Sequence, residues 1–219
     1  MPPPSPNTDT ANQKNVRPTR GRADSTRAGI VQAATTLFSE QGFEGVSVRD
    51  IEKAANVHRG LVAYHFDGKE TLWKLVADEA FGMMREALMR RQDVMQDMSP
   101  RVRLAFIIRF YVRFFSQHPE ISRLMSQEAR QASWRIEYLV SKHIKPASLL
   151  LKDRVAEALG LDQQAYIHWY YIMVSASSTI FTFAPECELL FGVDSRDEDR
   201  VKAHADMLVT MMLGEPAEG

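Results

Sequence analysis

Apolar residues recur at helical spacing along most of the chain, and no convincing run of alternating apolar and polar residues interrupts them. Near the N-terminus, Ile30, Ala34, Leu37 and Phe38 fall on one stripe of a helix. We expect that helix to end at Gly42, because glycine readily takes the left-handed conformation that closes helices. The pattern predicts an all-α protein.

The segment VSVRDIEKAANV carries clear helix-start features. Ser47 followed by Asp50 is a short-armed form of the capping box, and Val46 with Ile51 has the spacing of a hydrophobic staple. The helix is expected to stop before Asn56, a residue type that tolerates positive φ in turns. Another helical pattern begins just after it. Two short helices joined by three or four residues form a helix-turn-helix, whose second helix enters a DNA major groove.

The second of these helices is expected within VHRGLVAYHF. Gly60 in an early turn costs about 1 kcal/mol relative to alanine, and close approach to another molecule would explain its presence. Arg59, Tyr64 and His65 supply donors for phosphates or base edges. The alternative is that Tyr64 and His65 form the half-buried end of an ordinary helix, while Phe66 is expected in the core.

The next segment, FDGKETLW, predicts a further helix start. Asp67 is the expected N-cap with Glu70 at the N3 position, which puts Lys69 in the first turn. A cation there opposes the helix dipole. A phosphate bound at the same helix end would reverse that effect, so Lys69 is a candidate phosphate ligand.

The charge distribution points to local rather than global attraction for nucleic acid. The net charge is −1, but five cations lie between residues 14 and 27 against one anion, Asp24. Residues 1–22 are expected to be a disordered basic arm, and whether it touches DNA stays open. The N-terminus has no apolar signal-peptide core, and the single cysteine, Cys187, suits a reducing compartment. We therefore expect a cytoplasmic protein.

Residues 42–73, GFEGVSVRDIEKAANVHRGLVAYHFDGKETLW, resemble the DNA-binding domain of TetR-family transcriptional regulators. With the preceding helix, the resemblance covers about a quarter of the chain. We expect the DNA-binding domain to comprise residues 23–70. It implies that Ser47, Arg49 and Lys69 hold phosphates. It also implies a set of residues at the groove: Arg59, Gly60, Leu61, Ala63, Tyr64 and His65. Three positions depart from the family pattern: Asn56 replaces a usual glycine, His58 a capping serine or threonine, and Ala63 a frequent aromatic residue.

Residues 71–214 are expected to form a larger helical ligand-binding and dimerisation domain, followed by a flexible tail at 215–219. Expected helices run from Lys69 to about Met95, from Pro100, from about Pro119, and from about Ser133 to Gly160 with a break near Pro146. Residues 165–184 lack formal charge but contain serines, threonines and a histidine, so a buried helix is preferred to a membrane span. Segments 163–184 and 195–213 are the expected homodimer interface, in agreement with the resemblance.

The resemblance also implies a pocket for a small effector in the second domain. Methionine and aromatic residues favour an apolar or aromatic ligand, although each of them can equally be ordinary core. The residues expected to line the pocket are Tyr111, Met125, Glu128, Trp134, Trp169 and Met173.

The preferred function is a homodimeric repressor that a small effector releases from an inverted-repeat operator in double-stranded DNA. The alternatives are an enzyme that uses the same apolar pocket and a helix-turn-helix that contacts only proteins. The sequence contains no Gly-rich phosphate loop, His-Glu-x-x-His pattern or nucleophile elbow. We expect no catalytic residue, no metal and no cofactor.

Overall fold

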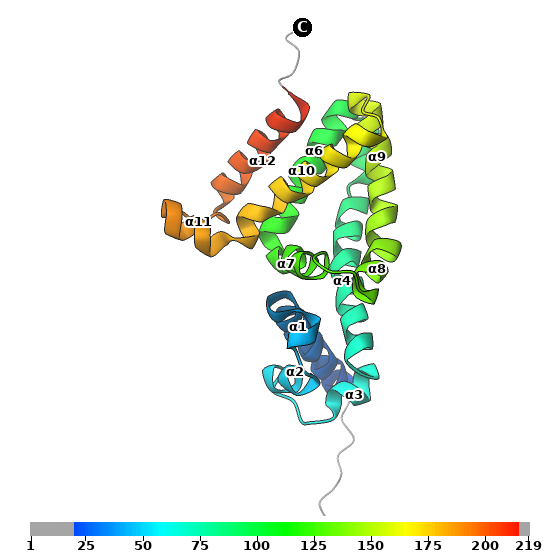
Figure 1. Ribbon diagram of the computed structural model, residues 1–219, viewed down its shortest axis with the longest axis vertical. Coiled ribbons are helices and arrows are strands. Elements are labelled where there is room, and N and C mark those ends of the chain that lie inside the picture. The colour runs from blue at the N-terminus through cyan, green and yellow to red at the C-terminus, as the bar shows by residue number, and fades with distance from the viewer. Residues whose placement is uncertain (1–19, 215–219) are drawn as a thin grey trace, which may run out of the picture.

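A computed structural model describes residues 20–214 of the chain, with side chains from residue 24 onward. Within that part every regular element is a helix, and no strand occurs. The all-α prediction is therefore confirmed (Figure 1). The tail expected at 215–219 and most of the arm expected at 1–22 lie outside the described residues, but the first helix already begins at Arg20.

Three helices form a small unit at one end of the molecule, in the lower part of Figure 1: α1 (Arg20–Gly45), α2 (Val48–Ala54) and α3 (Leu61–Phe66). The helical backbone of α1 is broken where predicted, because Gly42 has φ 71° and ψ 170°. The chain then turns so that the ring of Phe43 stacks on Phe38, with 5.9 Å between the ring centroids. Ile51 and Val62 are fully buried and join α2 and α3 to this core.

Helix α4 (Lys69–Met89) leads from the helix-turn-helix into the larger helical layer (Figure 1). Its buried face includes Leu72, Trp73 and Val76. The expectation that this helix continues to Met95 is wrong. Helical geometry stops after Arg90, and a short separate helix, α5 (Gln92–Gln96), follows. No glycine or proline stands at the break, which explains why the sequence pattern did not show it.

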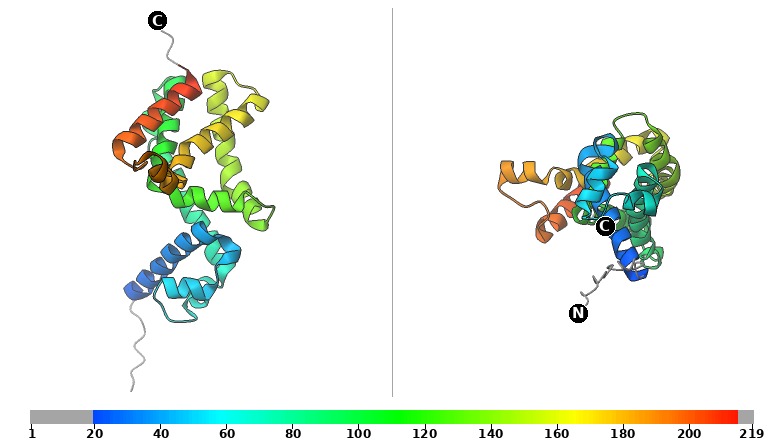
Figure 2. Two further views of the ribbon diagram at one scale, coloured as in Figure 1. Left: turned by 60° about the vertical axis from the view of Figure 1, so that its left-hand side comes forward. Right: turned by 90° about the horizontal axis from the view of Figure 1, so that it is seen from below.

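The remaining elements form the larger domain, seen from two more sides in Figure 2. Helix α6 (Pro100–Gln117) is central and packs against α7 (Pro119–Glu128), α9 (Lys145–Leu159), α10 (Gln163–Thr182) and α12 (Glu198–Leu213). Two of its arginines contact α12: Arg109 Nε lies 3.0 Å from Asp206 Oδ1, and Arg101 donates to the carbonyl oxygen of Leu213. The other elements of this domain are α8 (Trp134–Leu139), a π-helical turn η1 (Val140–Ile144) and α11 (Ala184–Phe191).

The break expected near Pro146 takes the form of the π-helical turn that directly precedes α9. Helix α11 was not expected. Helix α10 is buried on one face only: Trp169 and Met173 are buried, whereas Tyr171 and Ile172 are 67% and 56% exposed. None of the helices in residues 20–214 is long and apolar enough to cross a membrane.

Candidate nucleic-acid interface and ligand cavity

Helix α2 begins with the capping box expected from the sequence. The backbone N–H of Asp50 donates to Ser47 Oγ at 3.2 Å, and the N–H of Ser47 donates to Asp50 Oδ2 at 2.9 Å. The Ser47 hydroxyl also donates to Asp50 Oδ2, and this bond together with that from the Ser47 N–H lowers the pKa of the Asp50 carboxyl. Ser47 thus has a structural role besides the phosphate contact that the resemblance implies. Arg49 is exposed on the first turn of α2 and free to reach a phosphate.

The turn between α2 and α3 is held by Glu52, a residue that sequence reasoning missed. Glu52 is 5% exposed, and its Oε1 accepts the backbone N–H groups of Gly60 at 2.7 Å and Val62 at 3.3 Å. These are N–H groups at the start of α3, which have no partner within the helix itself. A carboxylate from one helix therefore caps the other and fixes the angle of the helix-turn-helix. The eight-residue separation from Gly60 gives no local sequence pattern that would reveal it.

The two turn residues singled out from the sequence both have positive φ. Asn56 has φ 52°, and Gly60, the N-cap of α3, has φ 91°. A Cβ on Gly60 would meet no atom within 4 Å in the described part of the chain. The glycine is therefore explained by its backbone conformation rather than by close packing, and its outer side is open.

Helix α3 buries Val62 and Phe66 and presents its other side to solvent. Tyr64 is 77% exposed, which rejects the half-buried interpretation for this residue, while His65 is half-buried with its ring 4.9 Å from that of Tyr64. Arg27 of α1 stacks over Phe66, and it lines a shallow hollow together with Tyr64 and His65. The structure brings together most of the predicted groove residues at this surface: Arg59, Gly60, Ala63 and Tyr64 are exposed, and Leu61 and His65 are partly buried beside them.

The predicted cap of α4 is wrong. Asp67 has φ 55° and ends α3, while Gly68, with φ 114°, is the N-cap of α4. Lys69 is therefore the first residue of α4, as close to the helix end as expected. Its Nζ lies 4.0 Å from the centroid of the Phe43 ring. Partial burial lowers the pKa of the Lys69 amine, although the nearby Glu44 opposes this effect.

Two residues predicted for the ligand pocket lie instead where the small unit meets the larger domain. The Trp134 ring packs edge-on against Phe43 and Trp73, with centroids 5.6 Å and 5.2 Å away. Glu128 is buried and its Oε2 accepts from Arg135 Nε at 2.6 Å; Arg135 also contacts Glu44 of α1 at 2.9 Å. This cluster ties α1, α4, α7 and α8 together.

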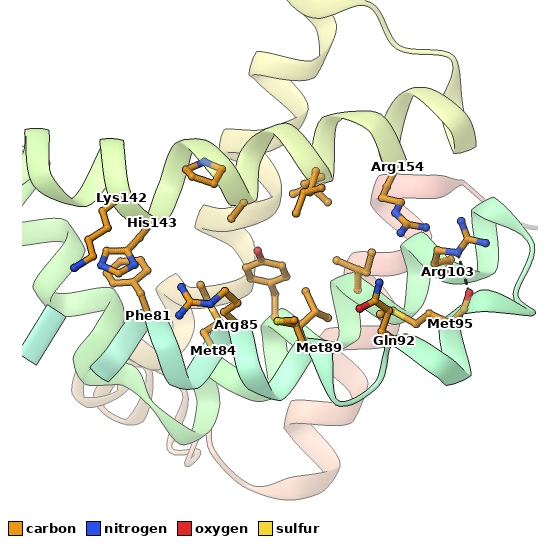
Figure 3. A pocket seen from close by; sticks show the side chains of 17 residues that line it. Phe81, Met84, Arg85, Met89, Gln92, Met95, Arg103, Lys142, His143 and Arg154 are labelled. Atoms are coloured by element: carbon orange, nitrogen blue, oxygen red, sulfur yellow. Dashed lines mark hydrogen bonds between the residues drawn. The ribbon is translucent and has the colours of Figure 1, made fainter. Parts of the chain in front are cut away.

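The larger domain contains a cavity of about 420 Å³ between α4, α5, α6, η1 and α9, which we call the α4–α9 cavity (Figure 3). That volume is within the range of small-molecule sites. Tyr111 lines it as predicted, and burial raises the pKa of its phenol. Met125, Glu128, Trp134, Trp169 and Met173 do not line it. The lining residues are Phe81, Met84, Arg85, Leu88, Met89, Gln92, Met95, Arg103, Ile107, Tyr111, Lys142, His143, Pro146, Ala147, Leu150, Leu151 and Arg154.

A polar cluster at one end of this cavity joins α4 to α8 and η1. Asp78 of α4 accepts from Lys142 Nζ at 2.7 Å, Tyr138 Oη at 2.9 Å and His143 Nε2 at 2.8 Å. Burial favours the neutral acid, but these hydrogen bonds prevail and lower the pKa of the Asp78 carboxyl. Figure 3 shows Phe81, Lys142 and His143 grouped at one end of the cavity, with Arg103 and Arg154 at the other.

Both parts of the chain match models of one family. Residues 30–76 match the model for bacterial regulatory proteins of the tetR family, and residues 100–212 match that for the tetracyclin repressor-like C-terminal domain. The chain belongs to the TetR family, and it is a DNA-binding transcriptional regulator.

A curated relative agrees with this assignment, and two solved structures share the fold. The biofilm-operon negative regulator IcaR of Staphylococcus epidermidis is 21% identical over 194 residues, which cover 84% of this chain and 97% of IcaR. The structure of AibR with isovaleryl coenzyme A and operator DNA has a TM-score of 0.68 at 17% identity, covering 88% of this chain and 100% of that one. FadR of Bacillus subtilis with stearoyl-CoA has a TM-score of 0.62 at 16% identity, covering 87% and 100%. Relatives of this kind are regulators, so the enzyme alternative is not favoured.

Proposed function

We propose that the protein is a homodimeric repressor that binds an inverted-repeat operator in the cytoplasm and leaves it when a small, largely apolar effector fills the α4–α9 cavity. One observation carries this proposal. Helix α4 begins at Lys69 beside α3 and, further along, supplies Phe81, Met84 and Leu88 to the cavity wall. It is one continuous helix that reaches from the recognition helix to the cavity.

On DNA, α3 is the recognition helix. Tyr64 and Arg59 face the base edges, while Arg49 and Lys69 hold phosphates on either side. Arg27 joins the candidate phosphate contacts, because it borders the exposed surface of α3. Ser47 contributes to DNA binding mainly through the cap that starts α2.

The second copy binds to an apolar face on α10 and α12. In the protomer, Ile167, Tyr171 and Ile172 on α10 and Met207 and Met211 on α12 are all at least 47% exposed. Large apolar groups clustered in this way are typical of an interface. Helix α11 continues this face. It has no buried residue within the protomer, and Leu189, Leu190 and Phe191 are 88%, 66% and 72% exposed.

Control follows from the position of α4. An effector that separates α4 from α9 would tilt α4 and change the distance between the two recognition helices, so that operator and effector favour different states. An apolar acyl chain is a reasonable occupant of the cavity, because two structural neighbours are described with acyl-coenzyme A compounds. Apolar residues of the cavity wall, among them Leu88, Ile107 and Leu151, can receive such a chain.

A footprint on the DNA upstream of the protein's own gene tests the proposal. We expect two protected half-sites related by a dyad and about one helical turn apart. Protection of a single half-site by a monomer would contradict the homodimer. Protein that binds no DNA of any sequence at low salt would contradict the proposed function as a whole.

A further inference from the structure

One residue that lines the α4–α9 cavity carries a buried hydrogen-bonding atom without a partner. The side chain of His143 is 3% exposed and lines the cavity, and its ring stacks on Phe81 with 5.1 Å between centroids. Its Nε2 is bonded to Asp78, but its Nδ1 is buried and has no partner anywhere in residues 24–214. Buried polar atoms normally have a partner, so an orphan in a residue that lines a cavity points to a ligand group.

The neighbours of His143 decide which kind of group this is. Asp78 is ionised and only accepts hydrogen bonds, so the ring proton sits on Nε2 and Nδ1 presents a lone pair. Burial lowers the pKa of the His143 imidazole, which keeps the ring neutral near pH 7. Nδ1 is therefore an acceptor, and its partner must be a donor.

We infer that the effector carries a hydroxyl or amide N–H group that donates to Nδ1 of His143 while its apolar part fills the middle of the cavity. This inference rests on the proposed effector role of the cavity and adds the chemistry that the cavity selects. His143 is the specificity-determining residue at this end.

A carboxylate at the same place is disfavoured. It would need a second proton on His143, and the burial of the ring opposes one. Asp78 of α4 favours the added proton but already accepts from Lys142 and from Tyr138 of α8. Lys142 and Arg85 both lower the pKa of His143, and burial acts in the same direction more strongly.

Three probes of equal chain length separate these possibilities: 1-decanol donates a hydrogen bond, decyl methyl ether only accepts, and decanoate is an anion. Binding to the full-length protein is measured by calorimetry at pH 7.5. We expect decanol to bind about 5- to 10-fold more tightly than the ether, the effect of one buried neutral hydrogen bond. Decanoate is expected to bind no better than the ether.

The variant His143→Phe keeps a ring against Phe81 and leaves Asp78 with its bonds from Lys142 and Tyr138. It should bind decanol and the ether equally. The matched control His118→Phe makes the same change at a histidine that does not line the cavity, and it should keep the preference for decanol.

Equal binding of decanol and the ether to the native protein would overturn the inference, and this arm needs no variant. Tightest binding of decanoate would do the same. A preference that persists in His143→Phe but disappears in Tyr111→Phe would assign the contact to Tyr111 instead. Failure of all three probes to bind would count against the cavity as an effector site, and so against the proposed function as well.

Discussion

Replacing Glu52 tests whether the buried carboxylate really fixes the recognition helix. In Glu52→Ala, the backbone N–H groups of Gly60 and Val62 lose the acceptor that now lies 2.7 Å and 3.3 Å away. Removing an N-cap acceptor costs about 0.5–2 kcal/mol, and a bond to a charged group is at the upper end of that range. Because Gly60 is exposed and water can reach it, we expect a total loss of about 2 kcal/mol in the free energy of unfolding.

The same change should weaken operator binding, because fraying at the start of α3 removes the conformation that fits the groove. If about 1.4 kcal/mol of the loss is felt in the bound state, operator affinity falls about tenfold. Glu52→Gln keeps one acceptor oxygen and should lose less in both measurements. Urea unfolding at fixed protein concentration and fluorescence anisotropy with labelled operator measure the two effects.

The control is Glu70→Ala, which removes an exposed carboxylate that pairs with Lys74 at 2.6 Å on the surface of α4. Such i,i+4 pairs contribute only about 0.2–0.5 kcal/mol. If Glu52→Ala unfolds at the same urea concentration as this control and binds operator equally well, Glu52 does not hold the helix-turn-helix together.

Three further predictions concern the DNA contacts, the dimer and pH. Lys69→Ala should weaken binding to all DNA about equally and lower the salt slope by about one, whereas Tyr64→Ala should cost about 1–3 kcal/mol more on the operator than on random DNA; equal losses would make Tyr64 a phosphate contact. Tyr171→Asp should convert a dimer of about 50 kDa into the 24.9 kDa monomer by light scattering and weaken DNA binding with it, and an unchanged mass would place the interface elsewhere. Since the pKa of Asp78 is lowered in the folded protein, its contribution to stability is present above about pH 4 and disappears as the pH falls further. Asp78→Asn should therefore lower the thermal midpoint at pH 7 and have little effect near pH 3; a similar effect at both pH values would contradict the assignment.

Local sequence patterns predicted the ends of the first two helices and the turn after them well, because those features depend on residues that are close together in the sequence. The Ser47–Asp50 capping box, the break at Gly42 and the turn at Asn56 were all expected and are present. The start of α4 was misplaced by one residue, since both Asp67 and Gly68 can end one helix and begin another. Only the backbone conformation distinguishes them.

The cavity could not be predicted from the same patterns. Its walls come from α4, α5, α6, η1 and α9, and the spacing of apolar residues along one helix does not say which of them face a void. Trp169 and Met173 were reasonable candidates by residue type but are packed in the core. Ser177 of α10 is fully buried within the protomer, so a substitution there would not report on the dimer alone. Tyr171, exposed on the same helix, is the position that reports on the interface.

The central claim is that the α4–α9 cavity and the operator are coupled through α4. The most direct measurement is calorimetric titration of an effector, found by thermal-shift screening, into the protein with and without saturating operator. Calorimetry is preferred to tryptophan quenching, because Trp73, Trp134 and Trp169 do not line the cavity. The account predicts that operator weakens effector binding by the same factor by which effector weakens operator binding; a change from about 99% to 1% competent protein needs a factor of about 10⁴, or about 5.5 kcal/mol. An effector that binds in the cavity with the same affinity in both titrations would contradict it.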